Sequence, residues 1–129
     1  MKWQALLRFL VIGLGLLAFS ALAQAQEYKA WLKIETNNSH LEIKAYCRNN
    51  TSEDSILRYK LKAQKRGGTG KTNSFQSGSV YLQSQSEKCL SKLGLRVSLK
   101  DEYEIKLEVY KRGKLVAKDF VVYSLGVGI

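Results

Sequence analysis

The sequence contains no proline, one histidine and two cysteines in 129 residues. His40 and one pair of cysteines cannot supply the usual ligand set of a structural metal site. We therefore expect no metal and no cofactor. Without proline, the edges of any β-sheet must be protected by charged residues, bulges or covering loops.

Signatures of an enzyme are also missing. A catalytic serine beside His40 would need a carboxylate to orient the imidazole and an oxyanion pocket, and the sequence shows no motif for either. Residues 67–72 end like a phosphate-binding loop, but Lys65 stands where the first glycine belongs, and a strand pattern follows instead of a helix. We expect no enzymatic activity and no catalytic residue.

The longest hydrophobic run lies at the start of the chain, after Lys2 and around Arg8, and small residues follow at Ala23 and Ala25. This order is typical of a signal peptide that is cleaved after export. We predict a signal peptide at residues 1–25 and a mature domain at 26–129; an uncleaved membrane anchor is the alternative. No later segment is long and apolar enough to span a bilayer. We expect the mature domain to be soluble in the periplasm, without stable membrane insertion; an extracellular location is the alternative.

Acidic residues are few: 11 Asp and Glu stand against 21 Lys and Arg. Lys2 and Arg8 belong to the predicted signal, which leaves a mature charge of about +8 (19 minus 11). Such a charge favours acidic or polar partners. The export signal, and glutamates interleaved with the basic residues, argue against nucleic acid, so we expect no nucleic-acid binding.

Period-two alternation of apolar and polar residues dominates the mature chain, with turn-forming clusters between the runs. The pattern predicts an all-β, seven-stranded, antiparallel immunoglobulin-like β-sandwich over about residues 27–123; a small closed barrel is the alternative. We expect a monomer. The predicted strands lie at about 31–36, 41–48, 57–63, 75–82, 93–99, 103–109 and 115–123. The predicted core comprises Leu32, Ile34, Leu41, Ile43, Leu61, Val97, Ile105, Leu107 and Val109.

Cys47 and Cys89 belong to a chain predicted to be exported, where oxidation is permitted. We predict an intramolecular Cys47–Cys89 disulfide. Two buried free thiols too far apart to join are the alternative.

Arg58, Lys60 and Lys62 alternate with apolar residues, which places all three on one face of a strand. An ordinary solvated sheet face explains such a pattern. A basic platform for an acidic, extended client chain is the functional interpretation.

Several short segments of the chain together suggest a known family. They are YKL at 59–61, GGTGKT at 67–72, QSGSV at 76–80, LS at 90–91, YEIKLEVY at 103–110 and GKLVAKD at 113–119. In these segments the sequence resembles the curli-assembly chaperones of the CsgC/CsgH type, particularly the CsgH-like branch. Residues 32–35 and 41–43 fit the first two strands of that family more loosely.

The resemblance implies an immunoglobulin-like sandwich in the periplasm that keeps curli-type amyloid subunits from polymerising before secretion. It implies no enzyme and no cofactor. Enterobacterial members carry a Cys-x-Cys motif early in the chain, whereas here Cys47 has no partner two residues away, so a redox role is not carried over. An exported structural or adhesive β-domain of the envelope or of surface fibres is the alternative function.

Overall fold

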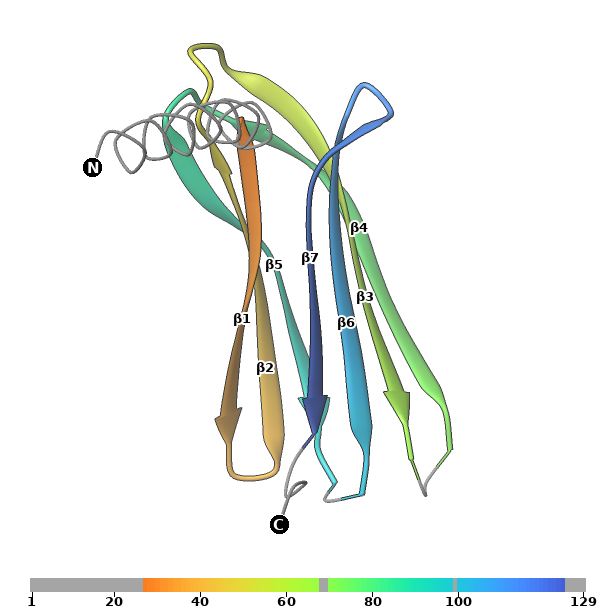
Figure 1. Ribbon diagram of the computed structural model, residues 1–129. Coiled ribbons are helices and arrows are strands. Elements are labelled where there is room, and N and C mark those ends of the chain that lie inside the picture. Colours follow the sequence, from red (N-terminus) through yellow and green to blue (C-terminus); the bar gives the residue numbers. More distant parts are fainter. Residues whose placement is uncertain (1–26, 68–69, 99, 125–129) are drawn as a thin grey trace, which may run out of the picture.

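The computed structural model describes residues 27–67, 70–98 and 100–124, and the regular structure in these segments is entirely β-strand (Figure 1). The predicted signal peptide lies outside the described residues. Seven strands follow one another along the chain, as predicted. They are β1 (Tyr28–Asn37), β2 (His40–Asn49), β3 (Ser55–Arg66), β4 (Thr72–Leu82), β5 (Ser86–Arg96), β6 (Glu102–Lys111) and β7 (Lys114–Ser124).

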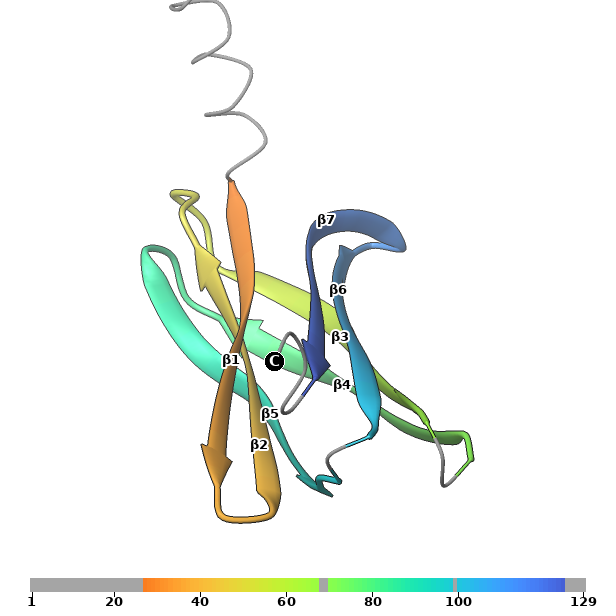
Figure 2. The ribbon, with the colours of Figure 1, turned by 60° about the horizontal axis from the view of Figure 1, so that its bottom comes forward.

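The strands form two antiparallel sheets, one with the order β1-β2-β5 and the other with the order β4-β3-β6-β7. The two sheets face each other as a sandwich (Figure 2), which confirms the predicted fold class. Constant-type immunoglobulin domains place their fourth strand beside the fifth. Here β4 pairs with β3 instead and becomes an outer strand of the four-stranded sheet.

The core lies between the sheets and is built from the inward positions of the alternating strands. Leu41 and Ile43 of β2 and Ile105 and Leu107 of β6 are fully buried. Seven of the predicted core residues are buried, whereas Leu32 and Ile34 are half-buried because β1 is an edge strand. The prediction omitted other buried residues, among them Tyr28, Ala45, Cys47, Leu57, Leu82 and Tyr103.

Two hairpins have tight turns with left-handed backbone conformations. Asn38, between β1 and β2, has a φ of 57°, and asparagine is one of the residues that tolerate this region. Arg112 and Gly113, between β6 and β7, have φ values of 52° and 78°. Positive φ at both central residues is the type I′ geometry, whose twist matches that of the flanking strands.

The fifth strand was predicted at residues 93–99, but β5 begins earlier and ends at Arg96. Its ladder with β2 shifts register between Ala45 and Tyr46, which is a β-bulge. The extra residue interrupts the alternation in the first half of β5, so the sequence pattern there did not indicate a strand.

Edge strands β1 and β7 lie side by side and close one side of the sandwich (Figures 1 and 2). The backbone N–H of Leu32 donates a hydrogen bond to the Asp119 carboxylate at 2.8 Å. This bond joins the two sheets and satisfies a donor on the edge of β1.

Candidate functional site on the outer face of the four-stranded sheet

The three basic residues singled out in the sequence lie on the outer face of β3, as their spacing predicted. Arg58, Lys60 and Lys62 are exposed, whereas Leu57 and Leu61 between and beside them are fully buried. Since β3 lies between β4 and β6, the triplet runs along an inner strand of this face.

The pairing registers place aromatic rings on both sides of the triplet. Lys62 is opposite Phe75 on β4 and Lys106 on β6, and Lys106 is in turn opposite Phe120 on β7. The row across the sheet therefore consists of two adjacent lysines between two phenylalanines, of which Phe75 is 60% exposed and Phe120 56%. Like charges directly opposite each other are mutually repulsive. Lys106 is 3.7 Å from the carboxylate of Glu108, so Lys62 is the lysine of this pair that an acidic partner would compensate.

None of the three basic side chains forms an ion pair with a described residue. The Nζ atom of Lys60 lies 5.2 Å from the centroid of the Tyr110 ring, within the range of a cation–π contact. The charges of the triplet are therefore accessible to an incoming acidic group.

The basic residues that follow on β3 are different. Lys65 is 3.3 Å from the carboxylate of Asp101, whose side chain is fully buried, and Arg66 is 2.6 Å from Glu104. Their charges are already compensated within the fold. Only the first part of the basic run thus remains unpaired by acidic residues of the described chain.

Most of the large hydrophobic side chains that are exposed also lie on this outer face, by the registers of the four strands. They are Ile56, Phe75, Tyr81, Phe120 and Val122. The sequence analysis missed them as a group. Each occurs on the polar side of its own strand, but their clustering depends on which strands pair.

A hollow of about 320 Å³ opens beside the triplet. Arg58, Lys60, Phe75, Ser77 and Tyr110 are among its lining residues, so it offers cations, rings and a hydroxyl group together. Burial and a hydrogen bond with Glu108 raise the pKa of Tyr110 above its usual value. The phenol therefore stays neutral at physiological pH and can serve as a contact surface, with no sign of an activated acid or base.

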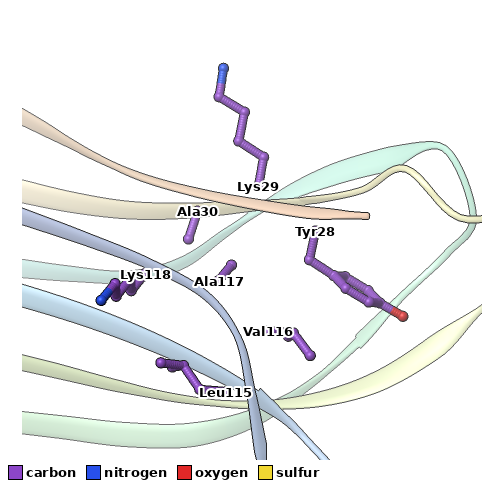
Figure 3. Close-up of a pocket in the computed structure, with 7 residues that line it drawn as sticks. All are labelled: Tyr28, Lys29, Ala30, Leu115, Val116, Ala117 and Lys118. Carbon is purple, nitrogen blue, oxygen red and sulfur yellow. The ribbon is translucent and has the colours of Figure 1, made fainter. Parts of the chain in front are cut away.

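A second hollow, of about 360 Å³, lies between β1 and β7 (Figure 3). Its lining is mostly apolar, with Tyr28 and Ala30 on β1 facing Leu115 and Val116 on β7. The lining contains no carboxylate, histidine or cysteine. This hollow therefore offers mainly an apolar contact surface.

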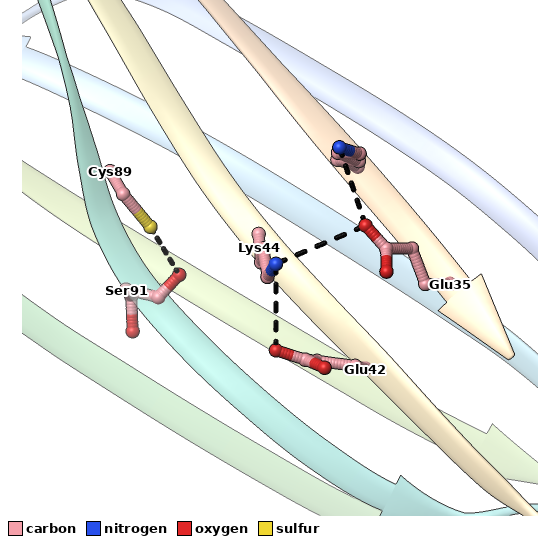
Figure 4. A network of polar contacts seen from close by, with 6 residues as sticks. Glu35, Glu42, Lys44, Cys89 and Ser91 are labelled. Atoms are coloured by element: carbon pink, nitrogen blue, oxygen red, sulfur yellow. Dashed lines mark hydrogen bonds and ion pairs between the residues drawn. The ribbon is translucent and has the colours of Figure 1, made fainter. Parts of the chain in front are cut away.

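The structure does not contain the predicted Cys47–Cys89 disulfide: both cysteines are free. In the register of β2 with β5, Cys89 is opposite Tyr46, and Cys47 is opposite Lys88. Neighbouring residues of a strand point to opposite faces, so Cys47 lies in the core while Cys89 lies on the outer face. There its thiol donates to the carbonyl of Ser91 at 3.6 Å (Figure 4).

Burial raises the pKa of the Cys47 thiol to about 11. The thiol therefore stays protonated at physiological pH, and the thiolate is the reactive form. Within residues 27–67, 70–98 and 100–124, no three His, Cys, Asp or Glu side chains are grouped to hold a metal ion. The same segments contain no helix that is long and apolar enough to cross a membrane.

No protein-family model and no curated protein matches this sequence. Solved structures do match. The E. coli curli protein CsgC superposes with a TM-score of 0.61 at 16% identity, covering 72% of this chain and 96% of that one. R. palustris CsgH superposes with a TM-score of 0.56 at 16% identity, covering 70% of this chain and 89% of that one. The chain has a CsgC/CsgH-like fold.

The same sandwich also occurs inside large enzymes. A Bacteroides uniformis β-glucuronidase matches 77% of this chain with a TM-score of 0.57 and 10% identity, but the match covers only 14% of the enzyme. CsgC and CsgH, in contrast, are matched over nearly their whole length. The similarity to CsgC and CsgH therefore extends to the size of the domain as well as to its topology.

Proposed function

We propose that this protein is a periplasmic chaperone of curli biogenesis that inhibits premature amyloid polymerisation of curli-type subunits. The observation that carries the proposal is the unpaired basic triplet Arg58, Lys60 and Lys62, set among exposed aromatic residues on a CsgC/CsgH-like fold. The proposed activity is binding alone, so it needs no catalytic residue and no cofactor.

Amyloid subunits are polar chains that polymerise when unpaired strands stack on one another. An inhibitor needs only to contact the extended chain often enough to delay nucleation. Exposed charges act over about 10 Å at ~0.1 M salt, so the triplet can attract acidic side chains of a client before contact. Phe75 and Phe120 then offer apolar surface to the captured segment.

The direct test replaces the triplet by uncharged residues as Arg58→Ser, Lys60→Gln and Lys62→Gln. These side chains are exposed, so each change should alter the free energy of unfolding by no more than about 0.5 kcal/mol. Thioflavin fluorescence of a purified curli-type subunit, mixed with substoichiometric protein, measures the lag phase. The wild-type protein should lengthen the lag, and the triple variant should lengthen it much less.

A matched control removes the same charge from the other sheet, as Lys29→Gln, Lys33→Gln and Lys92→Gln, all three of which are exposed. This control should inhibit nearly as well as the wild type. Equal inhibition by both triple variants, at low and at high salt, would show that the basic face is only solvated surface. No inhibition by the wild type, together with its recovery in extracellular fibres on fractionation, would instead favour a structural or adhesive β-domain.

A further inference from the structure

The sandwich has four edge strands, and three of them are protected. The edges of β1 and β7 lie against each other and are joined by the Leu32–Asp119 hydrogen bond. The edge strand β5 contains a bulge in its ladder, and four of its residues are charged. Pairing, bulges and charge are the usual means by which sheet edges avoid adding another strand.

The fourth edge, β4, is covered only in part: Lys88 of β5 reaches the carbonyl of Tyr81 at one end, and the side chain of Gln76 bonds to β5. The backbone of β4 between these contacts has none of the protections above. It pairs with β3 over 11 residues without a register shift. Its sequence, TNSFQSGSVYL, contains no charged residue and no proline. A long, regular and uncharged edge is a template for strand addition.

The hydrogen-bonding groups that face outward on β4 can be assigned. Lys88 donates from Nζ to the carbonyl of Tyr81 at 3.1 Å, so the Tyr81 carbonyl points away from β3. In an antiparallel pair the backbone groups of every second residue share one direction. The N–H and C=O groups of Ser79, Ser77 and Phe75 therefore also point to the open edge.

We propose that this open edge of β4 binds one extended segment of the client as an added strand. The occupant is a Ser/Gln/Asn-rich stretch with acidic residues at alternate positions. This inference rests on the proposed function, which it deepens by naming the contact and the type of segment. The backbone of β4 supplies the hydrogen bonds, as in other cases of β-strand addition.

The location of the edge beside the basic triplet favours this occupant. Strands in a sheet are about 4.8 Å apart, so an added strand would lie roughly 10 Å from β3. Its outward side chains would pass Phe75 and Ser77 and come within reach of the long side chains of Arg58, Lys60 and Lys62. Acidic groups at alternate positions would therefore meet the unpaired cations.

A second copy of this chain suits the edge less well. Pairing β4 with β4 of another molecule would join two proteins that each carry a net charge of about +8 after signal removal (19 minus 11). It would also bring two basic triplets onto one continuous face, where they would repel each other. Charge thus favours an acidic or neutral strand.

The test compares Ser77→Pro with Ser77→Thr. Proline removes the outward N–H of β4 but leaves the ladder with β3 intact, which is the position where an edge strand tolerates it. Threonine keeps the N–H and suits a strand. Far-UV circular dichroism and cooperative unfolding verify both folds, and Ser79→Lys, which charges the same edge, serves as a second blocking variant.

The probe is a synthetic Ser/Gln/Asn-rich peptide of about ten residues, the length of a strand such as β4, with aspartates at alternate positions. Binding should slow amide hydrogen exchange at Phe75, Ser77 and Ser79. It should also be about tenfold weaker in Ser77→Pro than in Ser77→Thr, the equivalent of about 1.4 kcal/mol.

Equal affinity of the two variants for the peptide, or protection that appears along β1, β5 or β7 instead, would overturn the proposal. So would a protein dimer in sedimentation that Ser77→Pro abolishes, because a second copy would then be the occupant. Failure of the proposed function looks different. In that case the peptide still protects β4, but the wild-type protein leaves the lag phase of the curli-type subunit unchanged.

Discussion

The outer faces of the two sheets differ in how their central lysine and their aromatic rings are compensated. On the three-stranded sheet, Lys44 lies between Glu35 and Glu42, with its Nζ 3.9 Å and 3.8 Å from their carboxylates (Figure 4). Trp31 and Tyr46 stack beside them with ring centroids 5.5 Å apart. On this face two carboxylates compensate the central lysine and the two rings pack on each other, although Lys33 and Lys92 lie opposite Lys44.

On the four-stranded sheet, the corresponding central position is occupied by Lys62, which is opposite Lys106. The rings in the same row, Phe75 and Phe120, are separated by the two lysines and remain exposed. Both faces contain lysines opposite lysines and both contain ion pairs, but only on the four-stranded sheet does the central lysine lack a carboxylate within the described part of the chain while the rings stay apart and exposed. This difference is the reason that the proposed binding surface is placed on the four-stranded sheet.

We expect the two sheets to differ only on their outer faces, while both contribute to the shared core. Replacing one core residue in each sheet tests this expectation and should give the largest change in the free energy of unfolding. Ile43 of β2 and Leu61 of β3 are both fully buried. Ile43→Ala and Leu61→Ala should each lower the free energy of unfolding by about 2–5 kcal/mol. Urea denaturation gives both values. A loss below about 1 kcal/mol for either one would mean that its sheet contributes little to the shared core.

Replacing one central lysine on each outer face should change the free energy of unfolding by a smaller amount, and the change should have opposite signs on the two faces. Lys44→Gln leaves Glu35 directly opposite Glu42, so the free energy of unfolding should fall by about 1 kcal/mol or less. Lys62→Gln removes the repulsion from Lys106 and should leave stability unchanged or raise it by a few tenths. Denaturation at low and high salt measures both changes. Equal losses for the two variants would contradict the comparison.

The smallest effect should come from Cys89→Ser. Because Cys89 is half-buried and free, we expect a change within about 0.5 kcal/mol. Loss of a native disulfide would cost about 2–5 kcal/mol. Alkylation of native protein under non-reducing conditions, followed by mass spectrometry, should modify Cys89 readily and Cys47 slowly, since burial raises the pKa of Cys47 to about 11. Protein isolated without any free thiol would show that the bond forms after all.

The sequence pattern predicted most of this fold because strand formation is locally encoded. Alternation along β2 and β6 identified both the strands and their buried sides, including Leu41 and Ile105. The pattern failed where one residue was inserted: the bulge opposite Ala45 and Tyr46 hid the first half of β5. Tyr103 was omitted from the predicted core for a different reason, because a buried tyrosine needs a hydrogen-bond partner for its hydroxyl group and the pattern does not show one. In the fold this hydroxyl group donates to the carbonyl of Arg96 at 2.8 Å.

The sequence by itself determined which residues form strands and turns, and that Arg58, Lys60 and Lys62 share the outward face of one strand. These properties depend on the period of the backbone and on neighbouring residues. Only the tertiary structure decided which strands pair. Pairing placed Phe75 and Phe120 in one row with Lys62, left β4 as an open edge, and set Cys47 and Cys89 on opposite faces. The physical reason is that register is fixed by contacts summed over strands distant in sequence, and a shift of one residue exchanges the two faces.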